Sequence, residues 1–155
     1  MALSRSRFRF LSALFVAVVF GLASASEVAS AEKQGEIHVA TKSGQHKLSV
    51  EWAVTPSERE HGLMGRETMA PNHGMLFDFG SEQPLYFWMK NTPLSLDMIF
   101  IKADGRTSHI ERATTPFSED LIPGGEPARY VLELVAGSAE RLALAPGDRF
   151  AIPRH

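Results

Sequence analysis

The chain has no cysteine among its 155 residues. Disulfide bonds, thiolate nucleophiles and cysteine-based metal sites are therefore excluded. A lipoprotein anchor is excluded as well, because it requires an acylated cysteine directly after the signal segment. The absence also suits an oxidising compartment, where a free thiol is a liability.

Long hydrophobic runs are absent except near the N-terminus. Three arginines at positions 5, 7 and 9 precede an apolar stretch over residues 10–22, and small residues follow it. The stretch is shorter than the roughly 20 residues that a spanning helix needs, so it is typical of a secretion signal. We expect residues 1–25 to be a bacterial Sec-type signal peptide, with residue 31 as the alternative end. The protein is then periplasmic or secreted, and an uncleaved membrane anchor is the alternative.

An excess of positive charge is also absent. The net charge is −2, and the first 25 residues hold three arginines and no acid, so the remainder carries −5. Nucleic-acid binding relies on clustered lysine and arginine, and an acidic domain is not attracted to anionic lipid. We therefore expect no nucleic-acid partner, and no membrane partner once the signal is removed.

What remains has the composition of one ordinary globular domain, with 44% hydrophobic and 22% charged residues. Residues 26–35 are mostly small and polar, as in a flexible lead-in. The single folded domain is expected over residues 36–155. We expect this domain to be a monomer.

Short strands separated by turn residues fill this domain. Alternating or continuous apolar patterns predict strands over 36–41, 47–54, 75–79, 85–90, 96–102, 107–113, 128–134 and 149–152. The strand over 85–90 is apolar on both faces, so we expect it to be central in its sheet. Asp104 and Gly105 predict a two-residue hairpin turn. The fold class is mainly β, a compact sandwich or barrel-like single domain.

One or two short helices complete the prediction, which makes the fold α+β on a generous count. Thr55 is a good N-cap, Pro56 suits the first helical position, and Glu58 completes a capping box. This helix is expected over 56–63. A second short helix is expected over 137–145.

Four stretches carry a resemblance to a known family. They are His-Gly-Leu-Met-Gly-Arg at 61–66, Gly-Met-Leu-Phe-Asp-Phe at 74–79, Phe-Trp-Met-Lys-Asn-Thr-Pro-Leu-Ser-Leu-Asp at 87–97, and Tyr-Val-Leu-Glu-Leu at 130–134. In this order they resemble the DUF192 family, over about residues 39–150. The resemblance implies a compact, mainly β domain that bacteria often export. It implies no established catalytic residues, so none is carried over to this chain.

Asp97 is the most informative polar residue, because it stands in an otherwise apolar run and a buried charge needs partners. Hairpin register predicts Lys90 opposite Asp97 on one side and Arg112 on the other. A satisfied ion cluster that fixes the register is the structural interpretation, and we favour it. A carboxylate in a polar pocket is the functional interpretation.

Other polar positions give weaker signals. Arg66, with Glu67 and His61, could bind a small anion at the exit of the first helix. His61 and His73 could ligate a metal, but their spacing matches no established site. The candidate ligand-binding residues are Arg66, Lys90, Asn91, Asp97 and Glu133. We predict no catalytic residue, metal site or cofactor. The methionines and aromatic residues are interpreted as core, with an adaptable ligand pocket as the alternative.

Two functional hypotheses follow. The first is a non-catalytic binding or accessory module of the cell envelope, which holds a ligand or protein on a sheet face or on the loop over 115–127. The second is a small envelope hydrolase that uses the carboxylates of Asp97 and Glu133. The hydrolase hypothesis requires Asp97, Glu133 and Lys90 to converge on one open pocket, and the binding hypothesis does not. A structural subunit with an exposed apolar patch is a third alternative.

Overall fold

The structure of the chain is a computed structural model, and it describes residues 34–153. The predicted signal peptide lies outside the described residues, as does most of the predicted lead-in. Gln34 and Gly35, expected at the end of that lead-in, already belong to the first strand. Within residues 34–153, no helix is both long and apolar enough to cross a membrane.

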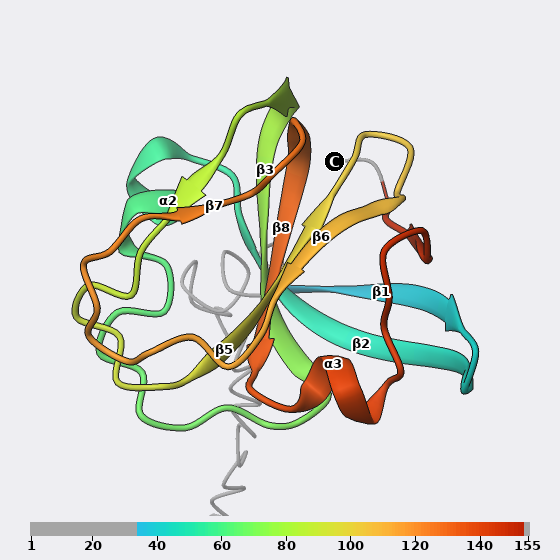
Figure 1. Cartoon of the computed structure of the whole chain (residues 1–155), viewed down its shortest axis with the longest axis horizontal. Coiled ribbons are helices and arrows are strands. Elements are labelled where there is room, and N and C mark those ends of the chain that lie inside the picture. The colour runs from blue at the N-terminus through green and yellow to red at the C-terminus, as the bar shows by residue number, and fades with distance from the viewer. Residues whose placement is uncertain (1–33, 154–155) are drawn as a thin grey trace, which may run out of the picture.

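A curled seven-stranded sheet forms the body of the molecule (Figure 1). Its strands are β1 (Gln34–Thr41), β2 (Gly44–Ala53), β3 (His73–Gln83), β5 (Leu96–Ile101), β6 (Thr107–Glu111), β8 (Ala128–Val135) and β9 (Arg149–Ala151). The order is β6-β5-β8-β3-β2-β1-β9, with β2 and β3 parallel and the other pairs antiparallel. An isolated bridge between Arg106 and Arg149 brings the two edges together. The mainly β, barrel-like prediction is confirmed.

A separate two-stranded ribbon, β4 (Tyr86–Phe87) with β7 (Ile122–Pro123), lies beside this sheet. The prediction of a central strand over 85–90 was therefore wrong. Leu85 and Met89 are buried, but Tyr86 is 63% exposed and Trp88 is 40% exposed. Residues 85–90 are apolar on both faces because the segment packs Leu85 and Met89 on the sheet and exposes the rings of Tyr86 and Trp88 on its other side.

The first predicted helix is confirmed as α2 (Pro56–His61). The Thr55 hydroxyl accepts from the Glu58 amide at 3.2 Å, and the Glu58 carboxylate accepts from the Thr55 amide at 3.0 Å. This capping box satisfies amides that the first turn leaves open. Gly62 follows at a φ of 47°, which ends the helix. The second helix, α3 (Ser138–Arg141), is shorter than predicted.

The hairpin between β5 and β6 has a three-residue connection instead of the predicted two. Lys102 and Arg106 are bonded across it, and Gly105 stands at a φ of 83°. A third residue in the left-handed conformation shifts the register by one at Phe100 and Ile101, as a bulged hairpin requires. Beyond the shift the pairing follows the predicted register, with Met98 opposite Glu111.

The central strands are buried on both faces, so there are two hydrophobic cores. The first core lies inside the curled sheet beside α3 and contains Ile37, Val39, Leu48, Val50, Trp52, Leu76, Ile99, Ile101, Tyr130, Leu132, Leu134, Ala139, Leu142, Leu144 and Phe150. The second core lies on the other face and contains Ala53, Leu63, Met75, Phe77, Leu85, Met89, Leu96, Met98, Phe100, Ala128 and Val131. Figure 1 shows α2, β4 and β7 on one side of β3, with β1 and β2 on the other.

Candidate functional site

A pocket of about 380 Å³ opens beside the second core, between α2, the end of β3 and the segment that contains β4. We call it the Glu133 pocket. It is lined by Pro56, Arg59, Glu60, His61, Gly62, Leu63, Met64, Phe77, Phe79, Tyr86, Phe87, Trp88, Lys90, Thr92 and Glu133. The lining is largely aromatic and apolar, and its charged groups are few. Small-molecule sites have this character and this size range.

Glu133 forms the inner wall of the pocket. It lies on β8 between Met75 of β3 and Met98 of β5, the residues directly opposite it on the two neighbouring strands. Glu133 is only 4% exposed, and its side chain makes no hydrogen bond or ion pair with any other residue of the range 34–153. Burial raises the pKa of the Glu133 carboxyl to about 8. At neutral pH this group is therefore mostly an uncharged acid.

Aromatic rings form the outer wall. Phe87 stands edge-on to Phe77 and Phe79, with centroid distances of 5.3 and 6.1 Å. Two cations lie on ring faces at the pocket: the Arg59 guanidinium is 4.9 Å from the Phe79 centroid, and the Lys90 ammonium is 5.0 Å from that of Trp88. Such contacts are favourable because the ring face is electronegative.

The two cations differ in how firmly they are held. Arg59 donates to the carbonyls of Val54 and Asp78, so its guanidinium is fixed between α2 and β3. The Asp78 carboxylate accepts two bonds from Arg129 at 2.9 and 3.0 Å, which ties β3 to β8 at this end. Lys90 has no ion pair among the described residues, and its flexible side chain can move.

Of the five residues expected from the sequence to bind a ligand, Glu133 and Lys90 line the same pocket. Asn91 is exposed and lines a shallower hollow that shares Lys90 and Trp88 with it. Arg66 and Asp97 do not line the Glu133 pocket. From the sequence, Phe79, Phe87 and Trp88 were interpreted as core, with a ligand pocket as the alternative, because apolar periodicity does not distinguish a core face from a cavity wall; all three line the pocket.

The predicted ion cluster around Asp97 is wrong. The Asp97 carboxylate accepts from the backbone amides of Ala113 and Ala139, at 3.0 and 2.8 Å. It makes no ion pair with Lys90 or Arg112, and the Arg112 guanidinium donates to the Leu144 carbonyl instead. Asp97 is 1% exposed, so its role in this structure is to satisfy two amides at the start of β5.

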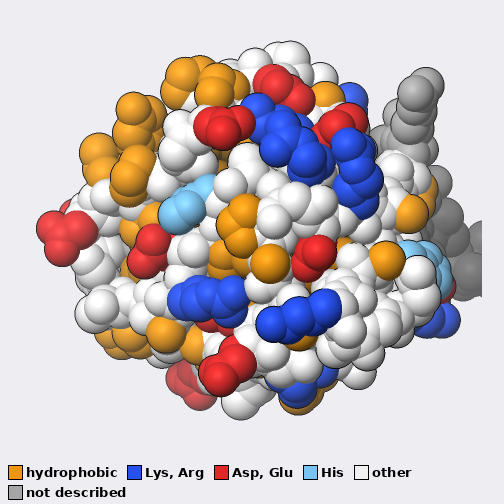
Figure 2. Space-filling model, turned by 45° about the vertical axis from the view of Figure 1, so that its right-hand side comes forward, with side chains coloured by type: hydrophobic (Ala, Val, Ile, Leu, Met, Phe, Trp, Pro, Cys, Tyr) orange, Lys and Arg blue, Asp and Glu red, His pale blue; other side chains and the backbone are white. Residues whose placement is uncertain are grey.

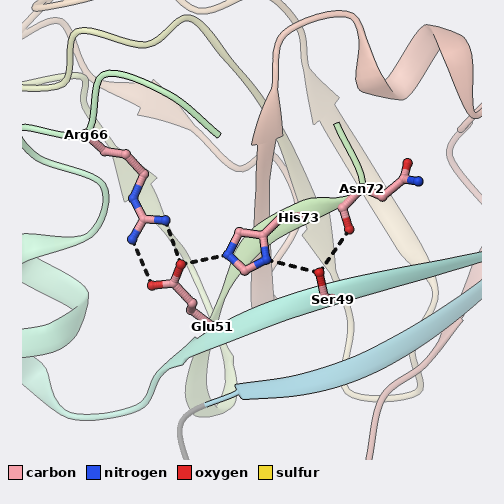
Figure 3. Close-up of polar contacts among 5 residues, drawn as sticks. All are labelled: Ser49, Glu51, Arg66, Asn72 and His73. Carbon is pink, nitrogen blue, oxygen red and sulfur yellow. Dashed lines mark hydrogen bonds and ion pairs between the residues drawn. The ribbon is translucent and has the colours of Figure 1, made fainter. Parts of the chain in front are cut away.

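Arg66 belongs to a different polar network, shown in Figure 3. Its guanidinium binds the Glu51 carboxylate through two bonds of 2.6 and 2.8 Å. His73 Nε2 lies 2.7 Å from the same carboxylate, and His73 Nδ1 lies 3.0 Å from the Ser49 hydroxyl. Hydrogen bonds from Arg66 hold the pKa of Glu51 below its ordinary value. The guanidinium is thus already occupied and is not a free anion site.

The Ser49, His73 and Glu51 side chains follow the order of a catalytic triad, but their setting does not suit one. Ser49 lies within β2, where its amide and its hydroxyl both bond to the Asn72 carbonyl. Glu51 is already neutralised by Arg66. The network ties the segment after α2 to β2, which is a structural role. Within residues 34–153, no three histidine or acidic side chains are grouped as metal ligands would be, and His61 and His73 do not meet.

Comparisons with known proteins agree with the fold. A crystal structure of a Sinorhizobium meliloti protein, provisionally labelled a transcription regulator, is 52% identical with a TM-score of 0.73; the match covers 76% of this chain and 92% of that one. A protein of unknown function from Novosphingobium aromaticivorans is 34% identical with a TM-score of 0.74, over 77% of this chain and 85% of its own. No curated protein matches the sequence.

The family model of DUF192, described as an uncharacterised ACR, matches residues 38–152. This range contains α2, every residue of the Glu133 pocket, and both cores apart from Ile37. The resemblance expected from the sequence motifs is therefore confirmed. The chain belongs to the DUF192 family.

Proposed function

We propose that this protein is a non-catalytic binding module of the bacterial cell envelope, which holds a small organic ligand in the Glu133 pocket. One observation carries the proposal: a buried carboxyl without a protein partner faces a cavity walled by aromatic rings. A buried polar group without a partner is costly to folding. A ligand that supplies the missing partner would offset that cost.

The hydrolase alternative has less support, because Asp97 and Glu133 project from opposite faces of the sheet. Asp97 is opposite Leu134, which belongs to the first core, whereas Glu133 is opposite Met98, which belongs to the second core. Two carboxyl groups that act on one bond must both reach it. Glu133 would have to act without Asp97, and the other acid that lines the pocket, Glu60, is exposed to solvent.

Nucleic-acid binding is likewise not proposed, although one solved relative is provisionally labelled a transcription regulator. On the face drawn in Figure 2, lysine and arginine side chains are interspersed with aspartate and glutamate. That face therefore carries no continuous basic surface of the kind that phosphate backbones require.

Binding is tested by NMR with the purified protein and a panel of small amines, alcohols and acids that carry aromatic or aliphatic bodies. We expect members of the panel to shift the Trp88 indole signal and the amide signals of residues 60–64. The amides of α3, on the other side of the sheet, serve as the internal control and should not move. A panel that leaves the pocket signals unchanged would refute a binding role. Turnover of p-nitrophenyl acetate that is lost in Glu133→Gln would favour the hydrolase instead.

The envelope location is a separate part of the proposal, supported by the charged and apolar pattern of residues 1–25. Expression in a bacterium, followed by fractionation and N-terminal sequencing, tests it. We expect the periplasmic fraction to contain a form that begins at residue 26, or at residue 32 if the alternative site is used. An intact chain in the cytoplasmic fraction would contradict the location without affecting the pocket.

A further inference from the structure

We infer that the ligand of the Glu133 pocket is a small organic amine with an apolar body, whose ammonium group pairs with the Glu133 carboxylate. This inference rests on the proposed function and adds the chemical class of the ligand. Three features support it: the Glu133 carboxyl has no donor beside it, the aromatic rings attract cations, and the two cations at the pocket, Arg59 and Lys90, leave room for an amine.

The inner wall lacks a donor. An ionised carboxylate only accepts hydrogen bonds, and the residues directly opposite Glu133 on both neighbouring strands are methionines. The next residue on the same face of β8 is Val131, which is buried in the second core. No described residue supplies a cation or an N–H group to the carboxyl. A ligand ammonium group would provide both, and its charge would favour the ionised form of Glu133, so the carboxyl would release its proton to solvent as the amine binds.

The outer wall favours a cation over other groups that could bond to this acid. A protonated Glu133 could also donate to a ligand carbonyl or carboxylate. Ring faces, however, attract cations and repel anions, and at this pocket Phe79 and Trp88 each hold a cation on their faces already. An ammonium group in the pocket would lie among these rings and those of Phe77 and Phe87, which also line it.

The cations at the mouth do not exclude an amine. Arg59 is fixed to two backbone carbonyls. Lys90 is partly exposed and unpaired among the described residues, so it can move away from an incoming charge. Glu60 lines the same mouth and offsets one of the two positive charges.

Three probes of similar shape test the inference: phenethylamine as the cation, 2-phenylethanol as the neutral analogue and phenylacetate as the anion. Binding is measured by NMR titration and calorimetry on the wild type, on Glu133→Gln and on Glu140→Gln. Gln has nearly the shape of Glu but cannot ionise, and Glu140 is an exposed acid on α3, so it is the matched control. A dispersed NMR spectrum of Glu133→Gln shows that the variant is folded.

We expect phenethylamine to bind the wild type and Glu140→Gln alike, and Glu133→Gln about tenfold or more weakly, the loss expected for a charge-assisted contact. The alcohol should bind weakly and equally to all three proteins, and the acid should not bind. Equal amine affinity in Glu133→Gln, or tighter binding of the alcohol or the acid, would overturn the amine inference. If other members of the NMR panel still bind in the pocket, the proposed function survives that failure. If none does, both are refuted.

Discussion

At the scale of single residues, two buried acids on the central strands have opposite surroundings. The Asp97 carboxylate is bonded to two backbone amides, whereas Glu133 lies between Met75 and Met98 on the neighbouring strands and lines a cavity. The sequence identified Asp97 as unusual, because it interrupts an apolar run, and it gave Glu133 only as a candidate ligand-binding residue. The sequence could not predict the partners of the Asp97 carboxylate, since one bonded amide comes from Ala139, 42 residues away. Hairpin register could suggest only cross-strand neighbours such as Arg112.

The raised pKa of Glu133 predicts a pH-dependent stability. The ordinary value is 4.5 and the folded value is about 8. Below pH 4.5 the acid is protonated in both states, so burial costs nothing extra. Between these values the unfolded chain loses the proton and the folded chain keeps it, so folding stability falls as pH rises. Relative to Glu133→Gln, the wild type should lose about 1.4 kcal/mol per pH unit, up to about 5 kcal/mol above pH 8.

Urea denaturation of both proteins at pH 4.5, 6.5 and 8.5 measures this difference, and the other titrating groups cancel in the comparison. Parallel stability curves across this pH range would contradict a buried, uncompensated acid at position 133.

Asp97→Ala should destabilise the protein by about 3 kcal/mol or more, because two buried amides lose a charged acceptor. The Lys90→Ala variant is the comparison, since no ion pair with Asp97 exists to lose. In chemical denaturation at pH 7, Asp97→Ala should show the large loss of unfolding free energy and Lys90→Ala should not. A comparable loss for Lys90→Ala, with strong coupling in the double variant, would restore the ion cluster expected from the sequence.

At the scale of elements, the sequence predicts best where the signals are local. The capping box of α2 needs only Thr55, Pro56 and Glu58, and it is present as predicted. The segment 85–90 was misassigned because strand identity depends on a hydrogen-bonded neighbour, and the neighbour of β4 is β7, far along the chain. The pocket also has a non-local part. Its outer wall comes from α2, β3 and β4, which follow one another within residues 56–87, but its acid comes from β8, far along the chain.

Close contact between β3 and β8 places Glu133 beside the pocket, and Gly74 permits that contact. A Cβ at position 74 would lie 2.5 Å from the Glu133 carbonyl oxygen and 2.7 Å from a Leu134 methyl group. Gly74→Ala should therefore cost about 1–3 kcal/mol through overpacking. Ser81→Ala, at an exposed position of the same strand, should leave the denaturation midpoint unchanged. Equal midpoints for the two variants would show that the strands can separate freely.

Arg66 anchors the segment after α2 to β2 through Glu51. Arg66→Ala should speed amide hydrogen exchange over residues 62–72 and cost about 1 kcal/mol at pH 7, since both side chains are partly exposed. The lowered pKa of Glu51 means that this contribution is present above pH 4.5 and is lost as pH falls below it. Lys47→Ala, which breaks an exposed pair with Glu36, should not change exchange in this segment. Unchanged exchange in Arg66→Ala would remove the anchoring role.

At the scale of the whole molecule, composition and strand pattern were sufficient for the fold class, and the resemblance of four motifs was sufficient for the family, while the pocket required coordinates. The curled sheet has one core inside and one outside, and the outer core is incomplete beside α2. The cavity occupies this gap, and the unpartnered acid lies on its wall. The binding proposal and the amine inference both depend on that acid having no protein cation beside it.

The most direct test of this claim is the titration of the Glu133 carboxyl carbon by ¹³C NMR in the purified protein. We expect a midpoint at about pH 8, because the buried carboxyl has no protein cation beside it. A midpoint at or below the ordinary value of 4.5 would mean that water or a protein cation such as Lys90 reaches the carboxylate, and it would contradict the account.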